Sequence, residues 1–592
     1  MKQRIIAWAL VCLLLAGCAR TPEAPQAAEE PGERPAIAYV PLDDRPDNVE
    51  RVVYLAESLG YMLEMPERDW YRTKLDGQPL NENGTQYGDL GRLYGWVLEQ
   101  EAAGCDRYVL SMDQLLSGGL VNSRHAESTL DAWSPAGVQS ERRQMEQLLK
   151  TLSLDPNNRV WLLDSVMRLA PTTGYAGFGL EEYNALRAYG MEGRPVLTGE
   201  ELTLSGIKAD YRLGSGGQEL DPADFGLEDS HVEDYHAARE RKLELSDQML
   251  RQLSQGQGAY EAFRVLIGID DSSEEDSIQK NEIAYLRTLL REGDALLSGV
   301  DDLAFKAVTK LYLEESGWMG AAAAVRYFGG TEDRPACAYD YKPLTAIMEE
   351  HFAFFGLSAV SAPAQADLQV LVLTQPADQA EKDRYYSELI DDLETCRQQN
   401  WPVILIDAGN GAYGTAFHDA LTEKTELGWL FSYAGFLDMA IVTGTALSHG
   451  VARYAYLAGG QVTDPANTAF AKTLADSILK DFCYKTIVRE DILSYVRGEL
   501  GGSADNFWQP EVDRGAIVSR LDRGMEAAAA DVVKNLERSN LLVSLDGTLA
   551  GWGEITLSNY RFPWDRAFEI SMDLQIGSMT RPHKRLLGIY IR

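Results

Sequence analysis

Short apolar runs alternate with amphipathic stretches along most of this chain. Apolar runs of about four to eight residues that stop at turn-forming or charged residues are typical of strands buried on both faces of a parallel sheet. Between them, apolar residues recur with the helical period of about 3.6. The expected strands cover 37–42, 107–112, 159–163, 263–269, 295–298, 322–328, 368–374 and 403–406, and the expected helices cover 49–59, 90–103, 232–254, 343–356 and 380–398.

This alternation predicts a parallel α/β architecture. We favour two doubly wound domains over 36–320 and 321–500, because the alternation restarts near Ala322 after a set of five strands. The alternative is one β/α barrel with added elements. After residue 500 the pattern changes to that of a small α+β tail over 501–592. Its expected parts are a polar segment at 501–515, a helix near 517–538, and antiparallel strands near 541–543, 554–557 and 568–570.

Three stretches do not fit the simple alternation. The polar, Gly- and Asn-rich residues 66–89 predict a long loop, and long loops in compact domains are often functional. Residues 172–230 are rich in Gly and acids and are expected to be an irregular insertion. A short apolar segment, 439–442, runs into Gly444 and a helix that carries His449.

The N-terminus has the pattern of a bacterial lipoprotein signal. Lys2 and Arg4 precede an apolar stretch, and Leu15-Ala16-Gly17-Cys18 follows it, so residues 1–18 are expected to be a signal peptide with Cys18 as the lipid acceptor. Residues 19–35 are rich in Pro and acids and predict a disordered tether. No later run is long and apolar enough to span a bilayer. We therefore expect an extracytoplasmic protein that is held to a bacterial membrane by the lipid alone.

Composition limits the partners. The net charge of −35 argues against nucleic acid and polyanionic substrates, because long-range repulsion opposes both, whereas neutral or cationic ligands fit better. The remaining cysteines match no metal-binding spacing, and the scattered histidines form no zinc motif. The absence of a Gly-x-Ser-x-Gly turn argues against a serine hydrolase. Tyr (28) and Trp (11) are plentiful, as in clefts that bind sugars, although core packing also uses them.

Aspartates follow the predicted strands repeatedly. Ligands bind at the carboxyl ends of parallel strands in open sheets and barrels. A single Asp there is often a helix cap, but a cap uses one carboxylate, so doublets need another explanation. Two crowded carboxylates split their pKa values, as acid–base hydrolysis of a glycosidic bond requires. The same acids are also ligands for Ca²⁺ or Mg²⁺, although no EF-hand spacing is present. These residues are Asp43, Asp44, Asp113, Asp164, Asp270, Asp271 and Asp407.

Three arginines follow the first three strands closely. Arg45, Arg124 and Arg168 are suited either to neutralising these acids or to binding a ligand. Asp407 and Asn410, after the strand at 403–406, are the further candidates for orienting a substrate. Isolated histidines near apolar segments are more often structural than catalytic.

Several motifs resemble an uncharacterised bacterial family, catalogued as domain of unknown function 4127. The opening motif Val40-Pro41-Leu42-Asp43-Asp44-Arg45-Pro46 is the most specific of them. The resemblance continues through 110–113, 118–124, 167–172, 270–271, 299–302, 407–411, 433–435, 444–446 and 563–569. The chain departs from the family at Phe436-Leu437-Asp438, where the family tends to have Trp-Asn-Thr, and in the more acidic loop after Asp271. The resemblance implies a shared fold and confers no activity.

These observations lead to the hypothesis of a surface-tethered carbohydrate hydrolase. Its central expectation is that carboxylates far apart in the sequence meet in one hollow that solvent can reach. The expected catalytic residues are Asp43, Asp44, Asp113, Asp270 and Asp271, and the expected substrate-binding residues are Arg45, Arg124, Arg168, Asp407 and Asn410. No cofactor is expected, and a divalent metal is left open. The alternatives are a non-catalytic lipoprotein that binds a small solute, and an envelope scaffold.

Overall fold

The first half of the chain forms a six-stranded sheet in which every paired strand is parallel to its neighbours. The strand order is β2-β1-β3-β4-β5-β6. These strands are nearly all buried, as their apolar residues require. They are β1 (Ala36–Val40), β2 (Met62–Glu64), β3 (Arg107–Ser111), β4 (Arg159–Val166), β5 (Phe263–Ile269) and β6 (Ala295–Ser298).

The second half forms a five-stranded parallel sheet in the order β11-β10-β9-β7-β8. In each sheet, the strand that comes first in the chain has the second strand on one side and the third strand on its other side. This is the doubly wound order with a switch point beside the first strand, where ligands of such folds bind. The strands are β7 (Ala321–Phe328), β8 (Leu357–Ala359), β9 (Leu368–Thr374), β10 (Val403–Ala408) and β11 (Ser432–Gly435).

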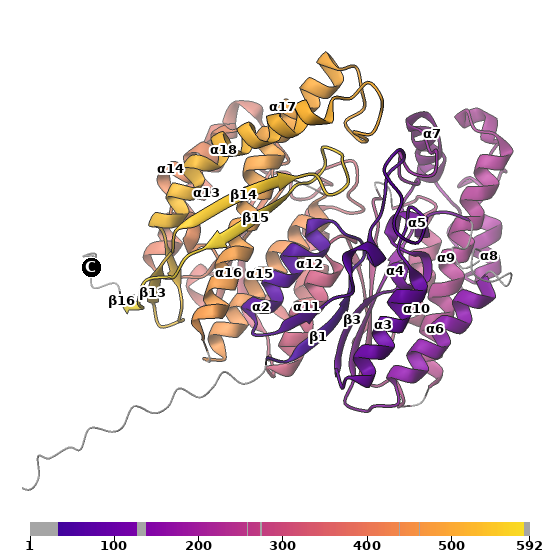
Figure 1. Cartoon of the computed structure of the whole chain (residues 1–592), viewed down its shortest axis with the longest axis horizontal. Coiled ribbons are helices and arrows are strands. Elements are labelled where there is room, and N and C mark those ends of the chain that lie inside the picture. Colours follow the sequence, from indigo (N-terminus) through magenta and orange to yellow (C-terminus); the bar gives the residue numbers. More distant parts are fainter. Residues whose placement is uncertain are drawn as a thin grey trace, which may run out of the picture. The chain divides into compact units, whose positions relative to one another are not determined.

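Helices cover both sheets (Figure 1). In the first half they are α2 (Glu50–Ser58), α3 (Leu90–Ala102), α4 (Met112–Ser117), α5 (Leu120–Ser123), α6 (Val138–Leu152), α7 (Leu180–Met191), α8 (Leu204–Asp210), α9 (Asp229–Gln255), α10 (Gln279–Leu289) and α11 (Leu303–Glu315). In the second half they are α12 (Leu344–Phe355), α13 (Lys382–Gln398), α14 (Ala416–Lys424), α15 (Met439–Ala458), α16 (Asp464–Ser477), two π-helices (Ile478–Val488 and Tyr495–Glu499), α17 (Arg489–Ser494) and α18 (Arg514–Arg538).

One hydrophobic core joins the two sheets. Helix α15 is buried along almost its whole length and packs against α11, α12, β10 and β11. Helix α2 packs against α11 and α16, so elements of both halves contribute to the same apolar cluster. Residues from 36 onward form one compact unit.

The C-terminal tail is antiparallel, as predicted. Strands β14 (Ile555–Arg561) and β15 (Ser571–Ile576) form a hairpin, and β13 (Thr548–Gly551) pairs with β12 (Asn540–Leu542) and β16 (His583–Lys584). Helix α18 packs against the longer π-helix and β14. The loop between β14 and β15 carries residues 563–569 to the site described below.

The computed structural model describes residues 34–126, 138–256, 258–272, 275–436, 438–460 and 462–584. The predicted signal peptide, Cys18 and nearly all of the tether lie outside these residues, as does Glu274 of the acidic loop. Within the described part of the chain, no helix is both long enough and apolar enough to cross a membrane.

The structure corrects several predicted elements. The strands β4 and β10 are longer than predicted, so Asp164 and Asp407 lie inside strands rather than after them. Residues 172–230 contain α7 and α8. The apolar segment 439–442 is the first turn of α15, the helix that carries His449. The strand predicted at 568–570 begins at Ser571.

Candidate functional site

The loop after β1 uses its first aspartate to hold its arginine. Asp43 is fully buried and accepts hydrogen bonds from Arg45 Nε (2.9 Å) and Nη2 (2.7 Å), and from Asn48 Nδ2 (3.1 Å). Arg45 then reaches across to the loop after β6, where its Nη1 donates to Asp301 Oδ2 at 2.9 Å. The guanidinium is thus fixed between two carboxylates from different strand ends.

The second aspartate of the loop binds the C-terminal tail. Asp44 Oδ1 accepts from the indole Nε1 of Trp564 at 2.8 Å and from Thr73 N at 3.2 Å. Arg68 donates to the other carboxylate oxygen at 3.2 Å. Burial raises the pKa of Asp44, and the charge of Arg68 opposes this shift. Asp44 therefore joins two segments that lie 520 positions apart.

Residues 563–569 complete this side of the site. The Trp564 ring lies 4.7 Å from the Arg45 guanidinium, and Glu569 Oε1 lies 3.5 Å from Arg45 Nη1. Glu569 is only 5% exposed, and neither of its carboxylate oxygens has a hydrogen-bond partner among the described residues. Burial and the charge of Asp47 raise the pKa of Glu569 to about 7. Its carboxyl group is therefore poised to exchange a proton near neutral pH.

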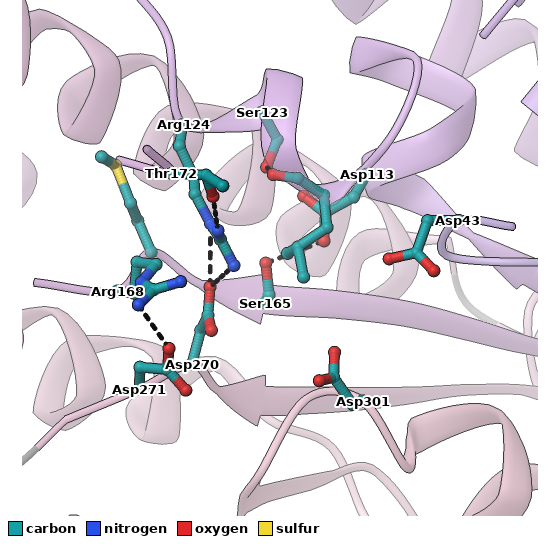
Figure 2. A network of polar contacts seen from close by, with 12 residues as sticks. Asp43, Asp113, Ser123, Arg124, Ser165, Arg168, Thr172, Asp270, Asp271 and Asp301 are labelled. Atoms are coloured by element: carbon teal, nitrogen blue, oxygen red, sulfur yellow. Dashed lines mark hydrogen bonds and ion pairs between the residues drawn. The ribbon is translucent and has the colours of Figure 1, made fainter. Parts of the chain in front are cut away.

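The doublet after β5 is paired with two arginines (Figure 2). Arg124 donates to Asp270 Oδ2 through Nη2 (2.6 Å) and Nε (3.1 Å). Arg168 Nη2 lies 2.6 Å from Asp271 Oδ2. Burial raises the pKa of Asp270 to about 6 even though Arg124 acts against it. Burial also opposes the charged form of Asp271, but Arg168 and a hydrogen bond with Asp438 together lower the pKa of Asp271.

Asp438 is the partner of Asp271. Its carboxyl group shares a hydrogen bond with Asp271, and burial followed by the negative charge of Asp271 raises the pKa of Asp438 well above its ordinary value. The shared proton therefore favours Asp438, and the negative charge favours Asp271. Both residues are partly exposed, with 22% of the Asp271 side chain open to solvent.

The backbone around Asp438 explains why its carboxyl group does not cap the helix that follows it. Asp438 directly precedes α15 but makes no side-chain cap bond to that helix. Asp340 takes that role, and its Oδ1 accepts from Met439 N at 2.6 Å. A small cavity of about 10 Å³ adjoins the pair and is lined also by Ser272, Ser298, Tyr339 and Tyr341. A space of this size admits about one water molecule.

Other predicted residues lie in separate networks. Asp113 and Asp164 both bind the buried ammonium of Lys242, the latter at 2.6 Å, and Ser165 donates to Asp113 at 2.7 Å. Asp113 is 1% exposed, so it serves as a counter-ion in the core beside the site. The structure thus brings together Asp43, Arg45, Arg124, Arg168, Asp270 and Asp271, and it gives Asp44 and Asp113 neighbouring structural partners.

Asp407 belongs to the second sheet. It accepts from Gly409 N at 3.1 Å and lies 3.1 Å from His418 Nε2 and 3.3 Å from the Tyr433 hydroxyl. Asn410 follows in a left-handed conformation (φ 46°). Neither residue makes a hydrogen bond or ion pair with Asp271 or Asp438 in the described part of the chain.

A match to one protein-family model shows which family this chain belongs to. The family described as "Protein of unknown function (DUF4127)" matches residues 37–573. The chain belongs to this family. No curated protein and no solved structure matches it significantly. In this DUF4127 protein, the first and last motifs named above, 40–46 and 563–569, meet through Asp44–Trp564 and Arg45–Glu569.

Sequence reasoning missed several members of the site in the DUF4127 protein. Asp438 had been noted only as a departure from the family, since it lies beside an apolar run rather than after a recognisable strand. Asp301 lies in the motif 299–302, and Arg566 and Glu569 lie in the motif 563–569 of the tail, but none of the three was among the expected site residues. The signal that would have revealed the last two is the density of charged and aromatic residues in 563–569.

Metal binding was the open alternative for these acids. Among the described residues, no group of three or more His, Cys, Asp or Glu side chains is placed to hold a metal ion. The site is better described as carboxyl groups with divergent pKa values among guanidinium groups, which suits proton transfer.

Proposed function

We propose that this protein is an acid–base hydrolase that acts on a carbohydrate, with the Asp271–Asp438 pair at its centre. The observation that carries this proposal is the shared hydrogen bond between two partly exposed carboxyl groups whose pKa values shift in opposite directions. Asp438 then holds a proton for a leaving oxygen, and the ionised Asp271 accepts the hydrogen bond that keeps this proton in place until it is transferred and Asp438 becomes a carboxylate.

The second carboxylate of the mechanism is Asp301. A hydrogen-bonded pair is closer than the roughly 5–5.5 Å of retaining glycosidases or the roughly 6.5–9.5 Å of inverting ones, so Asp271 and Asp438 act as one proton donor. Asp301 is ion-paired with Arg45, and its negative charge contributes to the raised pKa values of Asp438 and Asp270. We assign Asp301 the role of the nucleophile or of the base that activates water, because its negative charge acts on the carboxyl group of the proton donor.

Replacement of Asp438 and of Asp301 tests this proposal. Activity is measured on a panel of cell-wall, plant and host glycans, with and without chelator. We expect Asp438→Asn and Asp301→Asn each to lower kcat by at least about a hundredfold, because general acid–base groups contribute about that much. The control is Asp531→Asn, whose side chain is 83% exposed on α18. Full activity of Asp438→Asn, or no activity of the unaltered protein on any glycan, would refute the proposal.

The place of action is part of the proposal. A lipid on Cys18 would hold the protein at the outer side of a bacterial membrane, where polymeric carbohydrate is met. We expect Cys18→Ser to move the protein from the membrane fraction to the soluble fraction without changing its activity. Retention of the variant in the membrane fraction would exclude Cys18 as the anchor.

A second candidate is a non-catalytic receptor for a small solute. It is favoured by the extensive pairing of the acids with arginines, which leaves few carboxylates free. A solute that raises the melting temperature and is recovered unmodified would support this function over hydrolysis.

A further inference from the structure

The side of the site formed by the C-terminal tail carries an arginine without a carboxylate partner. Arg566 makes no hydrogen bond or ion pair among the residues that the structure describes, although it is partly buried. Its guanidinium lies 4.6 Å from the Trp564 ring and 5.1 Å from the Phe568 ring. Stacking between aromatic rings holds a guanidinium in place while leaving its N–H donors free.

The charges around Arg566 are those of a site for an anion. Burial lowers the pKa of Arg566 to about 10, and the next largest contribution is repulsion by the positive charge of Arg45. Arg168, which holds Asp271, acts on Arg566 in the same direction. Glu569 is the acid that acts most strongly on Arg566, but its own pKa is raised to about 7, so it neutralises Arg566 only in part.

A second guanidinium without a hydrogen-bond or ion-pair partner among the described residues belongs to Arg489. The Arg489 guanidinium lies 5.6 Å from the ring of Phe436, two positions before Asp438. Its Nε is buried. The negative charge of the exposed Asp505 raises the pKa of both Arg489 and Arg566, but Asp505 forms an ion pair with neither of them among the described residues. Buried guanidinium donors that lack a partner cost free energy unless a ligand satisfies them.

We propose that Arg566, supported by Arg489, binds a single anionic group on the substrate, a carboxylate or a phosphate, beside the Asp271–Asp438 pair. This inference rests on the proposed function only in calling the ligand a substrate, because binding of the anion can be measured without turnover. Guanidinium groups recognise both oxyanions through paired N–H donors. The negative charge of the whole protein does not prevent this, because exposed charges are screened beyond about 8 Å at physiological salt, whereas the guanidinium groups of the site act at contact distance.

Binding of sugars to the Asp438→Asn protein tests the inference without turnover. Glucuronate, glucose 6-phosphate and glucose are titrated calorimetrically at constant ionic strength. We expect one or both anionic sugars to bind more tightly than glucose, and the arm that binds identifies the oxyanion. Arg566→Gln should weaken anion binding about tenfold or more, as expected for the loss of a charge-assisted hydrogen bond. Arg566→Lys should restore part of it.

The matched control removes the same charge elsewhere. Arg384→Gln changes an exposed arginine on α13 and should leave anion binding unchanged. Circular dichroism and the melting temperature verify that each variant is folded. Equal binding of glucose and both anions, no binding of either anion, or unchanged anion binding by Arg566→Gln would overturn the inference. Loss of activity in Asp438→Asn is scored separately, so failure of the hydrolase proposal and failure of anion binding are distinguishable.

Discussion

At the scale of single residues, the position of an aspartate at a strand end predicts where the carboxylate lies but not what it does. Asp43 and Asp44 are adjacent in sequence, yet one fixes Arg45 and the other holds Trp564. Asp271 and Asp438 are 167 positions apart and share a hydrogen bond. The difference arises from partners that come from distant segments, which a single sequence does not reveal.

The bond between Asp44 and Trp564 should contribute to stability rather than to chemistry. We expect Asp44→Asn and Trp564→Phe each to lower the free energy of unfolding by about 1–3 kcal/mol, because a buried hydrogen bond to a charged group is lost. The double variant should lose less than the sum of the two, and chemical denaturation measures this coupling. Asp69→Asn, in the same loop region, is the control. Strictly additive losses would show that the two side chains do not interact.

The raised pKa of Glu569 should appear in the pH dependence of stability. The folded state binds a proton at Glu569 up to about pH 7, whereas a Glu in the unfolded chain releases it near pH 4.5. The folded state therefore binds more protons between these values, and Glu569 costs stability increasingly as the pH rises from 4.5 to 7.

Removal of this titration gives the prediction. The stability of Glu569→Gln relative to the unaltered protein should increase as the pH rises from 5 to 8, because the variant lacks the group that costs stability in this range. Denaturation at several pH values measures the difference, with Glu499→Gln, an exposed site, as control. A difference independent of pH would mean that Glu569 has an ordinary pKa.

At the scale of elements, α15 packs closely against α11 and α12. A Cβ atom on Gly444 would collide with Asp302, Lys306 and His351, side chains at or near those two helices. We expect Gly444→Ala to destabilise the protein by about 1–3 kcal/mol or more, since a packed core does not yield to added volume without strain.

A glycine in a more open helix provides the comparison. Gly95 in α3 has nothing within 4 Å of the position of its Cβ, so Gly95→Ala should stabilise the protein by about 0.5–1 kcal/mol. Chemical denaturation of both variants measures the contrast. Equal effects of the two replacements would contradict the packing described for α15.

The elements themselves were largely predictable from the sequence. The strands β5, β6 and β9 have their predicted bounds, because their apolar runs are continuous and end at turn-forming or charged residues. The short strands β2, β8 and β11 were missed, as were α16 and the π-helices. Their residues have no clean period, and their conformation depends on packing against other elements.

At the scale of the whole molecule, the two sheets are tied together by charge as well as by apolar contacts. Arg51 of α2 donates to Asp481 Oδ1 at 2.8 Å in the π-helix and to Asp476 Oδ2 at 3.3 Å in α16. Lys480 Nζ donates to Glu50 Oε2 at 2.8 Å. Breaking such buried pairs is costly, because charges are left without partners.

The described unit should therefore unfold as one. We expect a single calorimetric transition for the chain from residue 36 onward, and we expect a fragment of residues 36–320 to lack a cooperative transition, because its part of the shared core would face water. Two resolved transitions, or a fragment that unfolds cooperatively, would show instead that residues 36–320 form an independent domain.

The most direct test of the whole account is the protonation state of Asp438. Infrared difference spectroscopy of the unaltered protein against Asp438→Asn, at pH 8, reports the carbonyl vibration of a protonated carboxyl group. At this pH Asp270 and Glu569, with pKa values of about 6 and about 7, are mostly ionised. We expect a protonated carboxyl signal that disappears in Asp438→Asn. Identical spectra would contradict the shared proton and the acid–base role built on it.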